Sequence, residues 1–189
     1  MNAPLKYSFS SFPPITTALL FIQLVLLLLG NKVLSIGIAC NGCIAEGEWW
    51  RLISSLFVHT TFSHFLSNSV CCFALGFSLE KQLHSIRFPL VFLTSGITGN
   101  IASYLLFPPQ YTHTGASGAI FGLLGVQLYL FYMQYQPTRR KEILLFVIIL
   151  CILLAFTFLN TTTNSISHLA GLLTGACLGP LFIKKTDGA

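Results

Sequence analysis

Charged residues are scarce in this chain. Only 8% of its 189 residues are Asp, Glu, Lys or Arg, whereas a soluble domain carries about 25%. Hydrophobic residues make up 54%, more than one soluble core of this size can bury, so the surrounding solvent is expected to be lipid. The net charge of +5 comes from short clusters at the ends of apolar runs. That arrangement is typical of membrane topology and argues against a nucleic-acid partner.

The chain also lacks the cysteine pattern of a disulfide scaffold. Four of its six cysteines lie inside apolar runs, where they are expected to behave as small hydrophobic residues: Cys71, Cys72, Cys151 and Cys177. Cys40 and Cys43 lie instead in a polar loop. A local disulfide is open to them if this loop faces an oxidising compartment. A metal pair is the weaker interpretation, because no second pair at ligand spacing accompanies them.

Long apolar runs dominate the sequence. A helix that crosses about 30 Å of hydrocarbon needs roughly 20 residues, and six runs approach or exceed this length. The first run resumes past Lys32 and reaches Ala39, longer than the core of a signal peptide, so we expect a retained helix. The sequence therefore predicts an all-α membrane protein with a single domain over residues 1–189 and six spans, at about 15–36, 56–78, 87–106, 114–134, 143–160 and 164–183.

Basic residues distinguish the two sides of this predicted bundle. One side holds Lys6, Lys81, Arg87, Arg139, Arg140, Lys141, Lys184 and Lys185. The loops of the other side hold Glu46, Glu48 and Arg51, or no charge at all. The positive-inside rule then places both the N-terminus and the C-terminus in the cytoplasm.

This topology brings polar groups from three spans to one depth. Ser117 is about three residues into the fourth span and His168 about four residues into the sixth, which places both some 5 Å below the outer helix ends. His64 and Asn68 occupy the outer half of the second span. A hydroxyl or an imidazole buried without a partner costs several kcal/mol, so we expect these groups to meet.

Glycines at four-residue spacing predict which helix faces pack together. Two stripes are present, formed by Gly118 and Gly122 on the fourth span and by Gly171, Gly175 and Gly179 on the sixth. Such stripes let helix backbones approach closely in lipid. His168 shares the face of the longer stripe and Ser117 adjoins the shorter one, so facing stripes would make the two side chains neighbours.

These residues together resemble the motifs of the rhomboid intramembrane serine proteases. Four elements in the family's order and spacing carry the similarity: Trp50-Arg51, His64-x-x-x-Asn68, Gly115-Ala116-Ser117-Gly118 and His168-x-x-Gly171-x-x-x-Gly175. They cover nearly the whole chain and fit a rhomboid-like bundle of six transmembrane helices. The resemblance implies a serine endopeptidase that cleaves transmembrane segments of membrane-protein substrates in the lipid bilayer, with no metal or other cofactor.

The resemblance also implies a role for each site residue. Ser117 would be the nucleophile and His168 its general base, in a dyad without a carboxylate. No Asp or Glu occurs in the second, fourth or sixth span, which agrees with a dyad. The oxyanion and substrate-binding site would comprise His64, Asn68, Gly115, Ala116 and Phe121, with Phe121 stacked on the histidine. Donors are needed there because charge develops on the carbonyl oxygen in a medium of low dielectric constant.

The remaining polar residues near the site receive structural interpretations. His59 is expected to brace the loop before the second span, and His113 to be solvated just before the serine. His84 is expected to be inert in a cytoplasmic loop. Arg51 is expected to bond loop carbonyls or lipid headgroups.

The same residues argue against three alternative functions. A catalytically inactive rhomboid-like protein would bind membrane clients, but such relatives typically lose the serine or the histidine, and both are present here. A small transporter or metal carrier using His59, His64 and His168 would need intramembrane carboxylates or paired soft ligands, which the spans lack. A soluble Ser-His-Asp hydrolase is excluded by the spans and by Ala119, which breaks the G-x-S-x-G motif.

The ends of the chain are the basis for a predicted cellular location. The short tails predict a multi-pass protein of the bacterial cytoplasmic (inner) membrane. An organellar address is less favoured because an Arg-rich presequence is absent.

Overall fold

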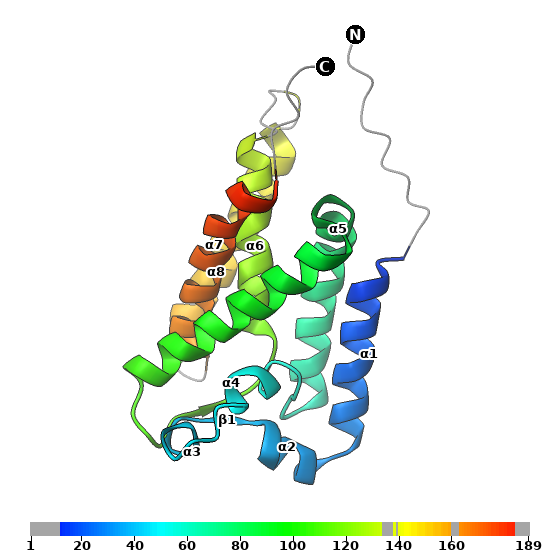
Figure 1. Ribbon diagram of the computed structural model, residues 1–189. Coiled ribbons are helices and arrows are strands. Elements are labelled where there is room, and N and C mark those ends of the chain that lie inside the picture. Colours follow the sequence, from blue (N-terminus) through cyan, green and yellow to red (C-terminus); the bar gives the residue numbers. More distant parts are fainter. Residues whose placement is uncertain (1–11, 134–137, 139, 160–162, 184–189) are drawn as a thin grey trace.

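The computed structural model describes residues 12–133, 138, 140–159 and 163–183. Helices and a two-stranded sheet follow one another along the chain (Figure 1). In chain order the elements are α1 (Pro14–Leu28), α2 (Asn31–Gly37), β1 (Ala39–Cys40), α3 (Asn41–Ala45), α4 (Arg51–Ser54), α5 (Phe62–Leu106), β2 (Thr112–His113), α6 (Ser117–Met133), α7 (Arg140–Leu159) and α8 (Ser165–Phe182).

The first predicted span is not one continuous helix. α1 ends at Leu28, and α2 leaves the bend at an angle of 117° to α1. Between them Gly30 has a φ of 78°, a backbone conformation that residues with a side chain rarely adopt. The prediction of a single helix over 15–36 is therefore wrong, because apolar character continues across a turn that the backbone makes at one glycine.

α5 contains the second and third predicted spans. Its 45 residues are interrupted at His84, whose φ of 62° and ψ of 172° are not helical. The two arms of α5 leave this break in different directions (Figure 1). The predicted cytoplasmic loop around His84 is thus only a sharp break within α5. The first arm begins at Phe62 and not at residue 56, because the Thr61 hydroxyl accepts a hydrogen bond from the backbone N–H of His64 at 3.1 Å and caps the helix there.

The centre of the bundle is the contact between α6 and α8. The two glycine stripes face each other: a Cβ added to Gly171 would collide with the carbonyl oxygen of Gly118, and one added to Gly175 with that of Gly122. Backbone therefore lies directly on backbone, as small-residue stripes permit in lipid. α5 packs against both helices, and its side chains form the buried core with those of α6, including Phe88, Phe92, Leu79, Leu123 and Leu130.

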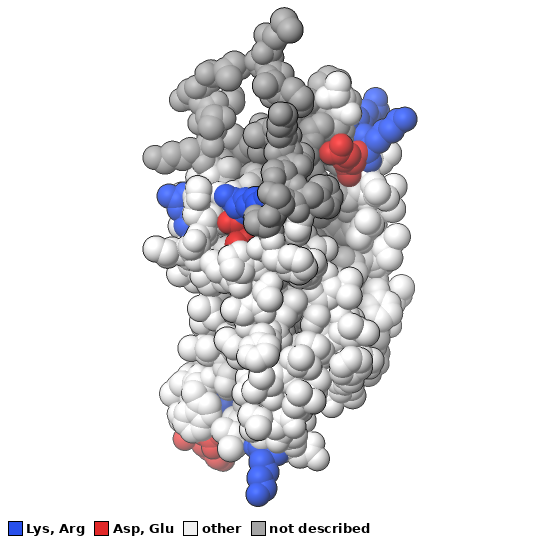
Figure 2. Space-filling view, turned by 90° about the vertical axis from the view of Figure 1, so that its right-hand side faces the viewer, with Lys and Arg blue, Asp and Glu red and all other residues white. Residues whose placement is uncertain are grey.

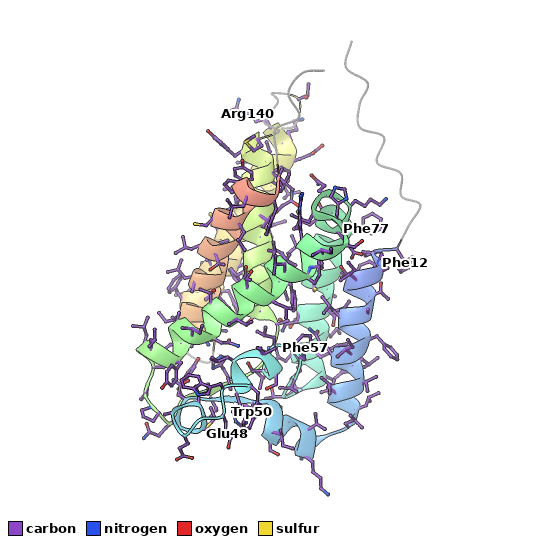
Figure 3. All side chains as sticks on the ribbon, viewed as in Figure 1. Phe12, Glu48, Trp50, Phe57, Phe77 and Arg140 are labelled. Carbon is purple, nitrogen blue, oxygen red and sulfur yellow. A yellow bond between two sulfur atoms is a disulfide. The ribbon has the colours of Figure 1, made fainter. Side chains whose placement is uncertain are left out.

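Charge is confined to the ends of the bundle. On the face that Figure 2 shows, Lys, Arg, Asp and Glu gather at two ends and leave an uncharged band between them. Glu48 and Trp50 lie at the opposite end from Arg140 (Figure 3). Within the described ranges, α5, α7 and α8 are long and apolar enough to cross a membrane, and α1 with α2 would add a fourth span if the bent pair counts as one. α6 is apolar but only 17 residues long.

The predicted orientation depends on residues of which the structure describes only some. Lys6, Arg139, Lys184 and Lys185 lie outside the described residues.

The segment between α1 and α5 is held by polar contacts and a disulfide. Cys40 and Cys43 form the disulfide that the sequence left open. Arg51 donates through Nη1 to the carbonyl oxygens of Ser35 and Ile38, at 2.9 and 2.8 Å, and forms an ion pair with Glu48. Of the two predicted kinds of partner for Arg51, the structure therefore provides loop carbonyls.

Candidate active site

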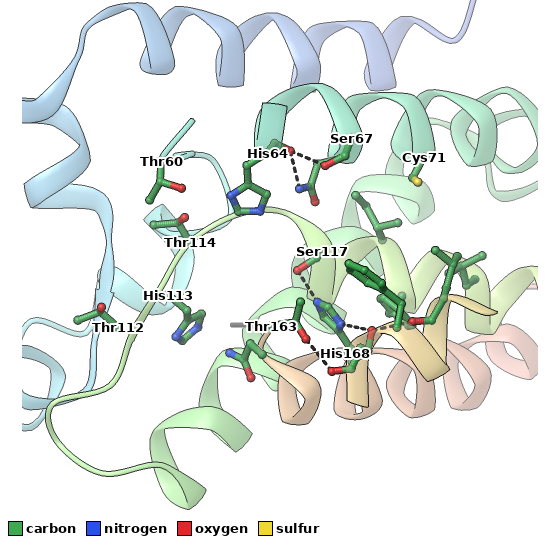
Figure 4. A pocket seen from close by; sticks show the side chains of 18 residues that line it. Thr60, His64, Ser67, Cys71, Thr112, His113, Thr114, Ser117, Thr163 and His168 are labelled. Carbon is green, nitrogen blue, oxygen red and sulfur yellow. Dashed lines mark hydrogen bonds between the residues drawn. The ribbon is translucent and has the colours of Figure 1, made fainter. Parts of the chain in front are cut away.

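A pocket of about 550 Å³ opens between α5, α6, α7, α8 and the loop that precedes α6 (Figure 4). Five of the predicted site residues line it: His64, Asn68, Ser117, Phe121 and His168. The two others, Gly115 and Ala116, belong to the loop that leads into α6 and do not line the pocket.

Ser117 is the first residue of α6, not three residues inside the helix as predicted. The first helical hydrogen bond runs from the N–H of Ile120 to the carbonyl oxygen of Ala116 at 2.9 Å. The N–H groups of the first turn, beginning with that of Ser117, therefore have no acceptor within the helix. They give this end of α6 a partial positive charge beside the serine hydroxyl.

Gly115 shapes the turn into α6. Its φ is 102°, and a Cβ at this position would lie 2.7 Å from Nε2 and Cε1 of His64. The backbone conformation and the nearby imidazole each require glycine here. The turn is anchored from the other side, because the N–H of Gly115 donates to the carbonyl oxygen of Ser55 at 2.8 Å.

His168 lies in the first turn of α8 and contacts Ser117 directly. Its Nε2 is 2.7 Å from the serine Oγ. The ring of Phe121, one turn after the serine, stacks on the imidazole with centroids 4.4 Å apart and planes inclined by 11°. The imidazole is thus fixed between an aromatic face and a hydroxyl, the arrangement in which a base can take the proton of a nucleophile.

The second ring nitrogen of His168 contacts α7. Nδ1 lies 3.0 Å from the hydroxyl oxygen of Thr157. Sequence reasoning did not identify this threonine. A signal was present, since Thr157 carries the only hydroxyl in the apolar sequence of α7.

His64 and Asn68 lie on α5 and line the pocket, and Figure 4 shows His64 on the opposite side of the pocket from His168. The amide Nδ2 of Asn68 donates one hydrogen to the carbonyl oxygen of His64 at 2.9 Å, which leaves its second hydrogen for another acceptor. The ring of His59 packs edge-on against that of His64, with centroids 5.0 Å apart. His59 is buried, in keeping with a bracing role.

His113 is half-buried and lines the pocket, and it has a side-chain partner in addition to the solvation that was predicted. Its Nε2 lies 2.9 Å from Oδ1 of Asn100, and an amide oxygen only accepts, so Nε2 carries the proton. Asn100 in turn donates to the hydroxyl of Ser55 at 2.9 Å, which ties this loop to α5 and α4. Burial lowers the pKa of His113 to about 4. The sequence did not indicate these contacts, because Asn100 lies on α5 and the pairing of Ala39 with His113 joins segments far apart in the chain.

Within residues 12–133, 140–159 and 163–183, no three His, Cys, Asp or Glu side chains are placed to share a metal ion.

The fold and the site define a helical membrane protein with a serine–histidine pair inside its bundle. The family model for the Rhomboid domain matches residues 46–185. The chain belongs to the rhomboid family and is an integral membrane protein.

Curated relatives agree with this assignment. Over 144 residues the chain is 39% identical to the rhomboid protein YdcA of Bacillus subtilis, covering 76% of this chain and 72% of YdcA. It is 35% identical to the rhomboid protease GluP of the same organism over 145 residues, which are 77% of this chain but 28% of GluP. It is 30% identical to Rhomboid-like protease 1 of Toxoplasma gondii over 177 residues, 92% of this chain and 60% of that protein.

Proposed function

We propose that this protein is an intramembrane serine endopeptidase that cleaves transmembrane segments of membrane-protein substrates with a Ser117–His168 dyad. The observation that carries the proposal is the 2.7 Å contact between the serine Oγ and the histidine Nε2 in a pocket among apolar helices. Membership in a family whose relatives GluP and Rhomboid-like protease 1 are named proteases supports it.

In the proposed reaction, Nε2 of His168 takes the proton of Ser117 as the Oγ attacks the carbonyl carbon of the scissile peptide bond. The tetrahedral intermediate collapses, the C–N bond breaks, and the leaving amine receives the proton from His168. The acyl-enzyme ester then reacts with water, which loses its proton to His168 in the same way and releases the new carboxyl end and free Ser117.

The developing oxyanion needs donors fixed in advance. The backbone N–H of Ser117 lies at the N-terminus of α6, where no helical acceptor competes for it. His64 and the second amide hydrogen of Asn68 are the side-chain donors on the facing wall of the pocket. Gly115 leaves room for the His64 ring, and Gly115 and Ala116 form the turn that leads into α6 and positions the N–H of Ser117.

The proposal includes six spans with both termini in the cytoplasm of a bacterium and the site near the outer leaflet. α1 with α2, the two arms of α5, and α6, α7 and α8 supply the six crossings. The disulfide between Cys40 and Cys43 supports this direction, because disulfides persist in oxidising compartments and not in the cytoplasm. A shallow site on that side gives water access to the acyl-enzyme.

The test is cleavage of a model single-span substrate by the protein purified in detergent. Ser117→Ala and His168→Ala should each abolish detectable cleavage, since loss of either member of such a dyad costs about 10⁶ in kcat. Ser35→Ala, whose hydroxyl contacts only the carbonyl of Lys32 on an exposed turn, is the matched control and should retain activity. Cleavage by Ser117→Ala at the wild-type rate would overturn the proposal.

Labelling separates this function from that of an inactive family member that binds clients. A fluorophosphonate should modify Ser117 in the wild type and fail to modify it in His168→Ala. A wild-type protein that remains unlabelled and uncleaving would instead point to client binding.

A further inference from the structure

α7 makes one buried polar contact with the rest of the protein at the proposed dyad. Of its residues, all of which the structure describes, Leu150 and Thr157 are buried. The Thr157 side chain is 3% exposed, and its hydroxyl oxygen lies 3.0 Å from Nδ1 of His168. Figure 4 shows the imidazole of His168 between two hydrogen-bond partners, one of which is the hydroxyl of Ser117.

The hydrogen-bond partners of Thr157 determine which way its hydroxyl points. The oxygen is also 2.9 Å from the carbonyl oxygen of Leu153, one turn earlier in α7. A carbonyl oxygen only accepts, so the single hydroxyl proton is donated to Leu153. The lone pairs of the threonine oxygen are then the acceptor for His168, and the proton in that contact must come from Nδ1.

This assignment fixes the tautomer of the imidazole. A neutral histidine carries one ring proton, and with that proton on Nδ1 the other nitrogen, Nε2, has its lone pair directed at Ser117. The opposite tautomer would place an N–H at Nε2, which cannot accept the serine proton. In hydrolases with a third group, a carboxylate bonded to the histidine selects the tautomer in this way.

We propose that Thr157 is a positioning residue that holds His168 in the tautomer and orientation required to activate Ser117. The inference rests on the proposed function. Phe121 stacks on the imidazole and fixes the plane of the ring, but stacking permits both ring flips about the Cβ–Cγ bond, which exchange Nδ1 with Cδ2. The Thr157 contact favours the flip that places Nδ1 toward Thr157 and Nε2 toward Ser117, so the two residues restrain His168 in complementary ways.

A purely structural role would require only the bond from Thr157 to Leu153. Thr94 provides the comparison, because its hydroxyl donates to the carbonyl oxygen of Leu90 at 2.7 Å in the same way, and Thr94 does not line the pocket. If activity falls when the hydroxyl of Thr157 is removed but not when that of Thr94 is removed, the fall therefore reports the loss of the contact between Thr157 and His168.

The experiment compares Thr157→Ser with Thr157→Ala. Both variants lose the γ-methyl group and differ only in the hydroxyl. In detergent, kcat and KM for a model single-span substrate and the rate of Ser117 modification by a fluorophosphonate are measured, with the thermal unfolding midpoint as a check on folding. Thr94→Val and Ser117→Ala serve as controls.

We expect Thr157→Ala to lower kcat and the labelling rate about tenfold or more with KM within about twofold, which corresponds to one orienting hydrogen bond. Thr157→Ser and Thr94→Val should stay within about twofold of the wild type. Equal kcat for the Ser and Ala variants would overturn the positioning role. Full cleavage by Ser117→Ala would instead overturn the proposed function, so the two failures are distinguishable.

Discussion

Gly175 is one of the residues through which α8 contacts the backbone of α6. Replacing it with alanine tests how much separation between these two helices the site tolerates. A Cβ at Gly175 would lie 2.5 Å from the carbonyl carbon of Gly122 and 2.8 Å from its Cα, where ordinary contact begins at 3.4 Å. No rotamer relieves a Cβ contact with backbone, and the carbonyl oxygen of Gly122 lies closer still, so the helices must move apart by at least about 0.9 Å. Such overpacking costs about 1–3 kcal/mol, of which the better helix propensity of alanine offsets up to about 1 kcal/mol.

The same displacement acts on the site. His168 is seven residues before Gly175 on α8, and Ser117 is five residues before Gly122 on α6. A separation of at least about 0.9 Å along the line between the helices lengthens the 2.7 Å hydrogen bond to about 3.6 Å or more, beyond the range of a hydrogen bond. Misplacement of this size costs about a hundredfold in rate, so Gly175→Ala should remain folded but lose most of its activity.

The assay is kcat for a model single-span substrate, measured beside the thermal unfolding midpoint. Cys177→Val is the matched control, because Cys177 is an exposed residue of the same helix two positions away and added bulk there meets no backbone. The reasoning fails if Gly175→Ala keeps both the kcat and the unfolding midpoint of the wild type.

Two further predictions concern the segments that connect the long helices. The disulfide joins residues only three positions apart, and closing so short a loop stabilises the fold by about 2 kcal/mol. Reductant should therefore lower the unfolding midpoint of the wild type but not that of Cys40→Ser/Cys43→Ser, and an unchanged wild-type midpoint would contradict this. Burial lowers the pKa of His113 from 6.5 to about 4. The pKa of His113 is thus lower in the folded state than in the unfolded state. The stability contributed by neutral His113 is fully present above about pH 6.5, and roughly 3 kcal/mol of it is lost as the pH falls toward 4. Between about pH 7 and about pH 4.5, the free energy of unfolding should therefore drop more in the wild type than in His113→Gln. Parallel curves for the two proteins would refute the lowered pKa of His113.

Periodicity carried most of what the sequence could predict. Gly171 and Gly175 are four residues apart, so they must lie on one helix face whatever the rest of the fold does, and the structure places them against Gly118 and Gly122. The approach of Ser117 to His168 follows from that packing. Hydropathy likewise identified most of the helical runs, because lipid demands apolar surface along their length.

Features that depend on a single backbone angle or on a partner far away in the chain could not be predicted from the sequence. Hydropathy continues unchanged across Gly30, so the 117° bend after α1 had no signature beyond one glycine. His113 looked solvated because its partner Asn100 lies on α5, and because the pairing of β1 with β2 that holds His113 is only two residues long. Thr157 was overlooked for a related reason, since an isolated threonine in an apolar helix usually bonds its own backbone.

α7 presents nearly all of its surface outward, and this has a consequence for how the surrounding membrane affects the proposed activity. Its 20 residues span about 30 Å, the hydrocarbon thickness of an ordinary bilayer. A thinner or thicker membrane tilts or displaces such a helix at little energetic cost, and Thr157 moves with it relative to His168. Membrane thickness would then act on the rate of the proposed chemical step through the contact between Thr157 and His168.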